Sequence, residues 1–222
     1  FSSDKKTILC YNLGKEKGFR VPIKNVCYEP YYYGINNEIE KAISGLEGLA
    51  SQIINLIIEN KDIKNLSLKQ ALDLLHFIAL QRGRTKRTGD SYIEVANKLF
   101  NKIKPKEFDN IRLTHKHPAL NSMLDCLLDA PLCLDLRPLL IINESKKDFI
   151  TSDNPTIFFN SFFNNKVDGG TDGFAQRGLQ VFFPVTSKLL LLFYDSNYYK
   201  IEGDNSTFFK IKKEEDIRRL NG

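Results

Sequence analysis

Hydrophobic residues recur with helical spacing in the first half of the chain and form short extended runs in the second. The strongest helical signal covers residues 67–83, where apolar side chains lie on every side of the helix from Leu72 to Leu80. A helix that is apolar all round must be covered by other elements. Ser67, followed three residues later by Gln70, predicts a capping box, and Gly83 predicts a left-handed turn at the end. The pattern therefore predicts a central core helix.

Neighbouring segments show weaker signals for further helices and for extended strands. Residues 37–60 carry apolar side chains at spacings of three and four, which predicts an amphipathic helix, and shorter helices are expected over 91–103 and 119–128. Two extended runs before them predict a hairpin with Gly14 or Gly18 in its turn. The extended runs of the whole chain are 7–12, 18–23, 136–143, 148–151, 156–159, 179–184, 188–194 and 207–211.

Together these elements predict one α+β domain over residues 1–222. It has an N-terminal β-hairpin, a central helical layer and a C-terminal, mostly antiparallel sheet that packs on the helices. At 222 residues and 42% hydrophobic content, the chain can bury a substantial core. Residues 164–178 are polar and rich in glycine, which is typical of a mobile surface loop or lid.

Positive charge is concentrated in one segment. The net charge is +5, yet residues 82–116 hold ten Lys and Arg against four Asp and Glu, so the remainder of the chain sums to −1. A basic segment can face phosphates or an acidic partner. The alternative, which is more common, is a solvated helix face with a basic loop.

Composition excludes several classes of protein. No apolar run approaches the length of a membrane span, and the first residues contain no secretory hydrophobic region. The four cysteines show neither metal-ligand spacing nor the density of a disulfide scaffold. We therefore expect free buried thiols, a cytoplasmic location and no membrane partner.

The exit of the core helix is the first candidate for chemistry. Gln81 and Arg84 follow directly on the buried run, so a rigid element holds them. A second candidate is ITSDNP, residues 150–155, where a strand is expected to end in polar residues. Asp153 there is a candidate general base, metal ligand or arginine partner, and Asn154 a group that orients a substrate. The alternative is an Asx-turn, in which both side chains bind their own backbone.

Histidines and carboxylates supply further candidates. His115 and His117 precede a helix that Pro118 is expected to begin, and free N–H groups at such an N-terminus favour an anion. Glu40 and Glu47, seven residues apart on one helix face, are weak candidates for a metal site. No third ligand joins the two histidines, and no known cofactor or catalytic motif is present. Cofactor and metal use are left open.

Several stretches, taken in order, resemble the signature segments of the bacterial family catalogued as domain of unknown function 4238. They span Val26 to Asp195 and read CYEPYYYGIN with EKAISGLEGLASQII, FIALQRGRT, FITSDNPTIF and GLQVFFPVTSKLLLLFYD. The family typically opens with a His-x-Val-Pro stretch that runs into Asn-Phe-Ser, and Phe1-Ser2 resembles the end of that stretch. The closing DIRRLNG resembles the start of a longer helix. The resemblance implies a core cut from a longer protein, inert if the absent histidine is catalytic.

The family supplies no activity, but the resemblance favours the polar residues within and between its segments. Our leading hypothesis is a cytoplasmic, hydrolase-like enzyme acting on a phosphate-bearing substrate, a nucleotide or nucleic acid. Arg84 would clamp the phosphate, His117 would be a general acid or base, and Asp153 a base or ligand, with Gln81, Asn154 and His115 binding substrate. The alternative is a non-catalytic domain whose basic segment, 82–116, binds nucleic acid or protein. Neither the substrate nor the oligomeric state follows from the sequence.

Overall fold

The structure of the chain is a computed structural model. It describes residues 6–12, 14–22, 25–26, 37–100, 118–163, 172–201 and 206–221. These residues belong to two compact units, one within residues 1–32 and one within residues 33–222. The single domain expected over the whole chain stays a prediction.

The first unit contains the predicted β-hairpin. Strand β1 (Thr7–Asn12) pairs antiparallel with β2 (Lys17–Pro22). The turn between them begins with the Asn12 side chain, which accepts a hydrogen bond from the Lys15 backbone N–H at 2.9 Å. Gly14 lies in this turn, whereas Gly18 lies inside β2 opposite Tyr11, so the first of the two predicted turn glycines is the right one.

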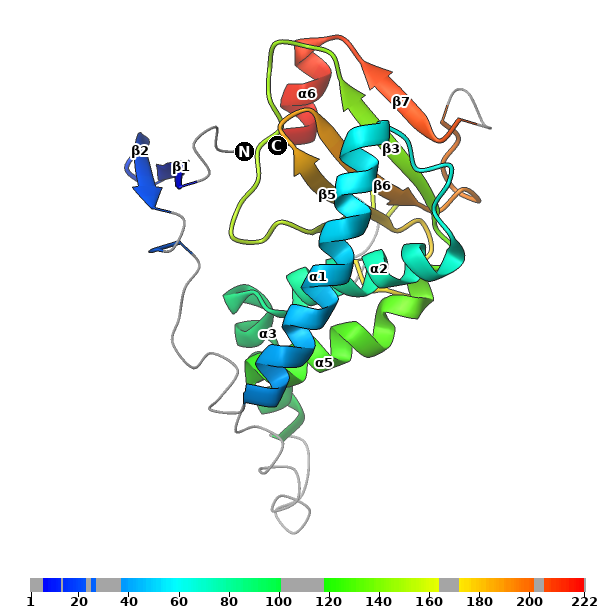
Figure 1. Cartoon of the computed structure of the whole chain (residues 1–222). Coiled ribbons are helices and arrows are strands. Elements are labelled where there is room, and N and C mark those ends of the chain that lie inside the picture. The colour runs from blue at the N-terminus through cyan, green and yellow to red at the C-terminus, as the bar shows by residue number, and fades with distance from the viewer. Residues whose placement is uncertain are drawn as a thin grey trace. The chain divides into compact units, whose positions relative to one another are not determined.

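The second unit begins with a layer of helices around one central helix (Figure 1). Its members are α1 (Asn37–Asn60), α2 (Leu68–Gly83), α3 (Lys86–Phe100), α5 (Pro118–Asp129) and the short 3-10 helix η4 (Ala130–Cys133). Helix α2 packs against each of the others, which confirms the predicted core helix. Its capping box is formed as predicted, because Ser67 and Gln70 each bind the other's backbone N–H.

Helix α2 ends at Gly83 as predicted, but for a different physical reason. Gly83 does not adopt a left-handed conformation, and the helix is capped by Arg84 at φ −82°. Glycine is required there because a Cβ would lie 2.7 Å from Met123 Cα and 3.0 Å from the Ser122 carbonyl oxygen. Ser122 Oγ also donates to the Gly83 carbonyl at 3.1 Å. Gly83 thus allows the close approach of α2 and α5 rather than a turn.

Helix α3 begins at Lys86, five residues before the predicted start at Ser91. The reason is an N-cap that the apolar pattern does not reveal. Thr85 Oγ1 accepts a hydrogen bond from the Thr88 backbone N–H at 3.2 Å, which satisfies one of the free donors at a helix start.

The second half of this unit is the predicted, mostly antiparallel sheet, with strand order β4-β5-β6-β3-β7. Pairing is antiparallel except for β7, which lies parallel to β3 at the edge. A tight hairpin joins β5 to β6, as the sequence predicts. The bounds are β3 (Arg137–Asn143), β4 (Ile157–Phe159), β5 (Gln180–Thr186), β6 (Leu189–Tyr194) and β7 (Phe208–Ile211), followed by helix α6 (Glu214–Asn221).

The sheet has helices on both faces, which explains its composition (Figure 1). Side chains of α1 and α2, such as Ile57 and Ile78, pack with Leu140 and Leu191 on one face. Ile217 of α6 belongs to the core on the opposite face. All six residues of β6 are buried, because a strand covered on both faces reads as a continuous apolar run.

One predicted strand is absent. Residues 148–151 are irregular, although their composition suggested an extended run. Only Phe149 of this segment is buried, so it has no alternating apolar face to place on a sheet. Within the described ranges, none of the helices combines the length and the hydrophobicity needed to cross a lipid bilayer.

The contact at Gly83 predicts a large cost for a small substitution. Gly83→Ala should lower the free energy of unfolding by about 1–3 kcal/mol, because the added methyl group overlaps the backbone of α5. Gly45→Ala is the matched control, since nothing lies within 4 Å of a Cβ at that exposed position of α1. It should stabilise the protein by up to about 1 kcal/mol. Urea unfolding of both variants measures the difference, and equal effects would contradict the close α2–α5 contact.

Candidate functional site

The C-terminal end of α2 places two of the predicted site residues. Gln81 is only 5% exposed, although it is polar. Its side chain makes no hydrogen bond within the part of the chain that the structure describes. Arg84 follows as the helix cap and is half-exposed. The burial of the preceding turns fixes where both side chains start, as the sequence predicted.

Arg84 meets another residue of the predicted set. Its Nη1 donates to Oε1 of Glu47 on α1 at 2.7 Å. Glu47 was a weak metal candidate, and the structure makes it the partner of the guanidinium instead. Because both groups are partly exposed, the pair contributes about 1 kcal/mol or less to stability. Glu40, the other metal candidate, is exposed on the same helix.

Arg82, which lies between Gln81 and Arg84 in the sequence, makes its contacts with a different part of the chain. Its guanidinium lies 4.0 Å from the centre of the Phe158 ring and binds the Asp172 carbonyl and carboxylate at 3.3 and 3.5 Å. A cation over an aromatic face, next to a carboxylate, is a stable arrangement. Arg82 therefore fixes the segment that begins at Asp172 onto α2. The described part of the predicted lid, residues 172–178, is docked in this way.

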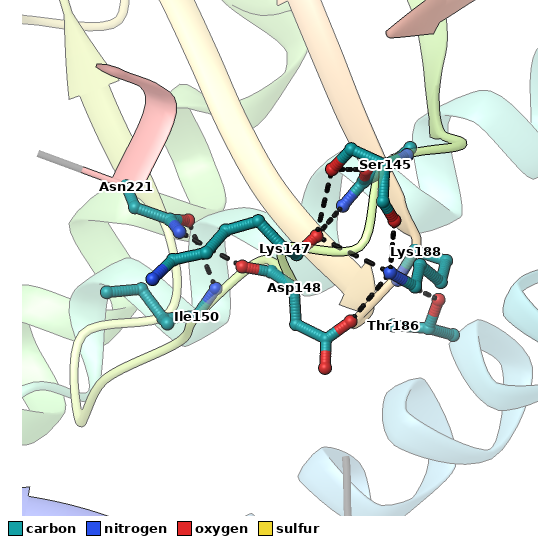
Figure 2. Close-up of polar contacts among 8 residues, drawn as sticks. Ser145, Lys147, Asp148, Ile150, Thr186, Lys188 and Asn221 are labelled. Atoms are coloured by element: carbon teal, nitrogen blue, oxygen red, sulfur yellow. Dashed lines mark hydrogen bonds and ion pairs between the residues drawn. The ribbon is translucent and has the colours of Figure 1, made fainter. Parts of the chain in front are cut away.

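Residues 150–156, which contain the candidates Asp153 and Asn154, are anchored at both ends. At the start, the Ile150 N–H donates to Asn221 Oδ1 at 3.2 Å, and Asn221 Nδ2 donates to the Asp148 carbonyl at 3.0 Å (Figure 2). At the end, Thr156 is fully buried and its Oγ1 donates to the Ile78 carbonyl of α2 at 3.2 Å. The segment is irregular yet fixed in place.

A polar network supports the first of these anchors (Figure 2). Lys188 Nζ, from β6's N-terminal turn, binds Asp148 Oδ1 and donates to the Ser145 carbonyl, both at 2.8 Å. Ser145 Oγ in turn binds Asn143 Oδ1 at 2.7 Å. The lysine thus ties the turn after β3 to the β5–β6 hairpin. This network is fully bonded, which indicates a structural role.

Within the anchored segment, the turn is made by Ser152 and leaves the two candidate residues out. Ser152 Oγ accepts from the Asn154 N–H at 3.1 Å and donates to the Asn154 carbonyl at 3.0 Å. This is a serine turn, so the alternative Asx-turn of Asp153 and Asn154 is wrong. Asp153 is exposed, whereas Asn154 Oδ1 is buried and has no hydrogen-bond partner among the described residues.

The structure therefore gathers part of the predicted set around the last turns of α2. Gln81, Arg84 and Glu47 lie at the helix end, and the Thr156 hydrogen bond joins residues 150–156 to the same helix at Ile78. Ile78 precedes Arg84 by six residues, a rise of about 9 Å. Helix α5 begins at Pro118 as predicted. His115 and His117 lie outside the described residues, and so does the part of the basic segment that follows residue 100.

Sequence reasoning missed the anchors rather than the candidates. Ser152 and Thr156 position Asp153 and Asn154, and Asp172 and Phe158 hold Arg82. The signal for Ser152 was present, since Ser two residues before a polar turn residue favours a serine turn. The contacts of Thr156 and Arg82 join segments 78 and 90 residues apart, so no local pattern could indicate them.

No metal site is evident in the ranges that the structure describes, where no group of three or more His, Cys, Asp or Glu side chains comes together. A hollow of about 350 Å³ lies beside α6, on the face of the sheet away from α2. None of the predicted site residues lines it. Its lining is mostly apolar and consists of Leu139, Ile141, Gln180, Phe182, Leu192, Ile201, Phe209, Ile211, Asp216, Arg219 and Leu220.

Comparison with family models matches residues 1–222 to the family described as Protein of unknown function (DUF4238). The chain belongs to this family, which confirms the resemblance of its four stretches. No curated protein and no solved structure matches the chain.

Two buried thiols near Arg82 give a direct test of the helical core. Burial raises the pKa of Cys126 to about 11 and that of Cys133 to about 12, so both remain protonated at neutral pH. Only the thiolate is a nucleophile. In a variant that carries Cys10→Ser and Cys27→Ser, an aromatic disulfide reagent at pH 8 should leave the native protein unlabelled and label both thiols after denaturation. Rapid labelling of the native state would contradict this packing.

Proposed function

We propose that this member of the DUF4238 family is a cytoplasmic, hydrolase-like enzyme acting on a phosphate-bearing substrate such as a nucleotide or nucleic acid. The substrate would bind where the end of α2 meets residues 150–156. One observation carries the proposal: Asn154 Oδ1 is buried without a hydrogen bond from the described part of the chain, and Gln81, at the end of α2, is only 5% exposed. Free, buried Cys126 and Cys133 support a reducing compartment.

A buried polar atom without a partner is costly. Leaving one unsatisfied lowers stability by about 1–3 kcal/mol, so folding alone does not favour Asn154 at its position. A ligand that offers an N–H or O–H to Asn154 Oδ1 would remove that cost on binding. Sites built to hydrogen-bond a substrate in this way discriminate strongly against molecules that lack the matching group. We assign Gln81 and Asn154 the task of orienting the substrate.

Arg84 supplies the positive charge of the proposed site. A guanidinium has five N–H donors, and the contact with Glu47 engages only Nη1. The remaining donors suit a phosphate oxygen, which planar guanidinium groups bind in bidentate fashion. Glu47 would hold the guanidinium in place before the substrate arrives. Because the pair is partly exposed, a phosphate can reach it.

The reacting groups of the proposal are Asp153 and His117. The exposed Asp153 carboxylate would accept a proton from the attacking water, and Arg84 would balance charge on the phosphate. His117 would donate a proton to the leaving oxygen. It precedes α5 by one residue, with His115 beside it in sequence.

The rival hypothesis is a non-catalytic domain that binds nucleic acid or protein through residues 82–116. Ion pairs within the described part of this segment reduce its free positive charge. Arg82 pairs with Asp172, Arg84 with Glu47, and Lys98 with Glu94. The buried Asn154 oxygen without a partner therefore favours the ligand site over the basic segment.

The decisive experiment compares two alanine variants in binding and turnover. Nucleoside mono-, di- and triphosphates would be titrated by calorimetry, and phosphate release measured in parallel. Gln81→Ala and Asn154→Ala should each weaken binding about tenfold or more, because each removes a hydrogen bond to the substrate. Gln52→Ala and Asn65→Ala are the controls, since both residues are exposed and neither belongs to the proposed site. They should bind as the wild type does.

The free energy of unfolding distinguishes a substrate-binding role of Asn154 from a structural role. Asn154→Ala should leave the free energy of unfolding unchanged or higher, because it removes an unsatisfied buried atom. A loss of more than about 2 kcal/mol would show that Asn154 belongs to a structural network, and would sink the substrate-binding assignment. Salt-dependent nucleic-acid binding that neither variant affects would favour the rival hypothesis instead.

A further inference from the structure

The outward side of α5 and η4 displays a row of exposed leucines. Leu124, Leu128 and Leu132 are spaced by four residues and are 46%, 77% and 50% exposed. Leu134, two residues further, is also exposed. Leu124 and Leu128 share one side of α5, and Leu132 and Leu134 continue the exposed apolar series through η4 and just past its end. We call these four residues the leucine row.

The opposite side of α5 is already used. Met123, Cys126 and Ala130 are buried there, in contact with residues of α2. Helix α5 is therefore apolar on two sides, and only one of them is covered by described residues. A helix with apolar residues all round normally lies inside a protein or an assembly. Contiguous exposed apolar residues of this kind mark an interaction surface.

Carboxylates run beside the leucine row. Asp125 and Asp129 each follow a leucine of the row, are four residues apart and are exposed, and exposed Asp135 follows Leu134. None of the three takes part in an ion pair within the described part of the chain. We call Asp125, Asp129 and Asp135 the acidic row.

The acidic row is unfavourable for the isolated chain. Burial, and then the neighbouring charge of Asp129, raise the pKa of Asp125. Asp125 also faces Tyr92 of α3, whose pKa is raised by burial and by Asp125, and Cys126, whose pKa is raised mainly by burial. Asp129 is also the last residue of α5, and the last turn has no basic residue to match the negative end of the helix dipole. Like charges four residues apart and carboxylates at a helix C-terminus both destabilise.

We propose that the leucine row and the acidic row together form the docking surface for a cationic amphipathic helix of a partner protein. Leucines of the partner would fill the space between Leu124, Leu128 and Leu132, and its Lys and Arg would meet Asp125 and Asp129. Leu124 and Leu128 are one turn of α5 apart, a rise of about 6 Å, and Leu132 adds a second turn in η4. Apolar residues at positions i, i+3 or i+4 and i+7 match that length.

Charge decides between the alternative occupants. A second copy of the chain would present the same acidic row, so like charges would face each other at a symmetric contact. Anionic lipid or nucleic acid would be repelled for the same reason. The whole chain carries a net charge of +5, so its overall charge does not attract a cationic peptide. The attraction must come from the acidic row itself. This surface is independent of the ligand site proposed above.

The test uses a defined probe, a fluorescein-labelled helical peptide of Leu and Lys with the spacing given above. Fluorescence anisotropy should show saturable binding to the wild-type chain, and binding should weaken as salt is added. The double variant Asp125→Asn/Asp129→Asn and the single variant Leu128→Ser should each bind about tenfold more weakly. A peptide with Glu in place of Lys should not bind.

Matched controls make the result specific. Glu59→Gln/Asp90→Asn removes the same two charges from exposed positions elsewhere, and Leu68→Ser alters a leucine that is 75% exposed, close to the 77% of Leu128. Both controls should bind the peptide as the wild type does. An absence of saturable binding, or equal loss in the controls, would overturn the proposal. Self-association abolished by Leu128→Ser would overturn it in favour of a second copy.

Discussion

The structure of the larger unit depends on the burial of α2. Residues such as Leu74, Ile78 and Leu80 are at most 1% exposed, and each contributes about 1.5–3 kcal/mol by leaving water. Because α2 is apolar on all sides, α1, α5 and the sheet must each present it with an apolar face. Two close approaches to α2 depend on particular residues, Gly83 against α5 and Thr156 against the Ile78 carbonyl. The rest of the layer follows from covering this helix.

Function is proposed where that burial ends. The last turns of α2 are rigid because their neighbours are packed, so polar side chains that emerge there are held without further support. Gln81 and Arg84 are such residues, and Asn154 is brought to the same helix by the Thr156 hydrogen bond. Preorganisation of this kind is what a binding site requires. The unsatisfied Asn154 oxygen is the cost that a merely structural segment would have no reason to carry.

The sequence predicted the elements and several site residues, because helix periodicity, capping and apolar strands are local properties. The core helix, the hairpin and the β5–β6 pair were all accessible in this way. Long-range causes were not: Gly83 suggested a turn but serves a helix contact, and residues 148–151 suggested a strand but are fixed by Asn221 and Lys188. Arg84 and Glu47 were candidates for separate tasks, and only the fold shows that they meet.

The most direct test of the account observes the side-chain amides of Gln81 and Asn154 themselves. In an NMR titration with a nucleoside triphosphate, the side-chain NH2 signals of Gln81 and Asn154 should shift together and saturate at one ligand concentration. The signals of the exposed Gln52 and Asn65 should remain in place. Shifts confined to basic residues of 82–116, with Gln81 and Asn154 unmoved, would contradict the account and show that phosphate is bound elsewhere.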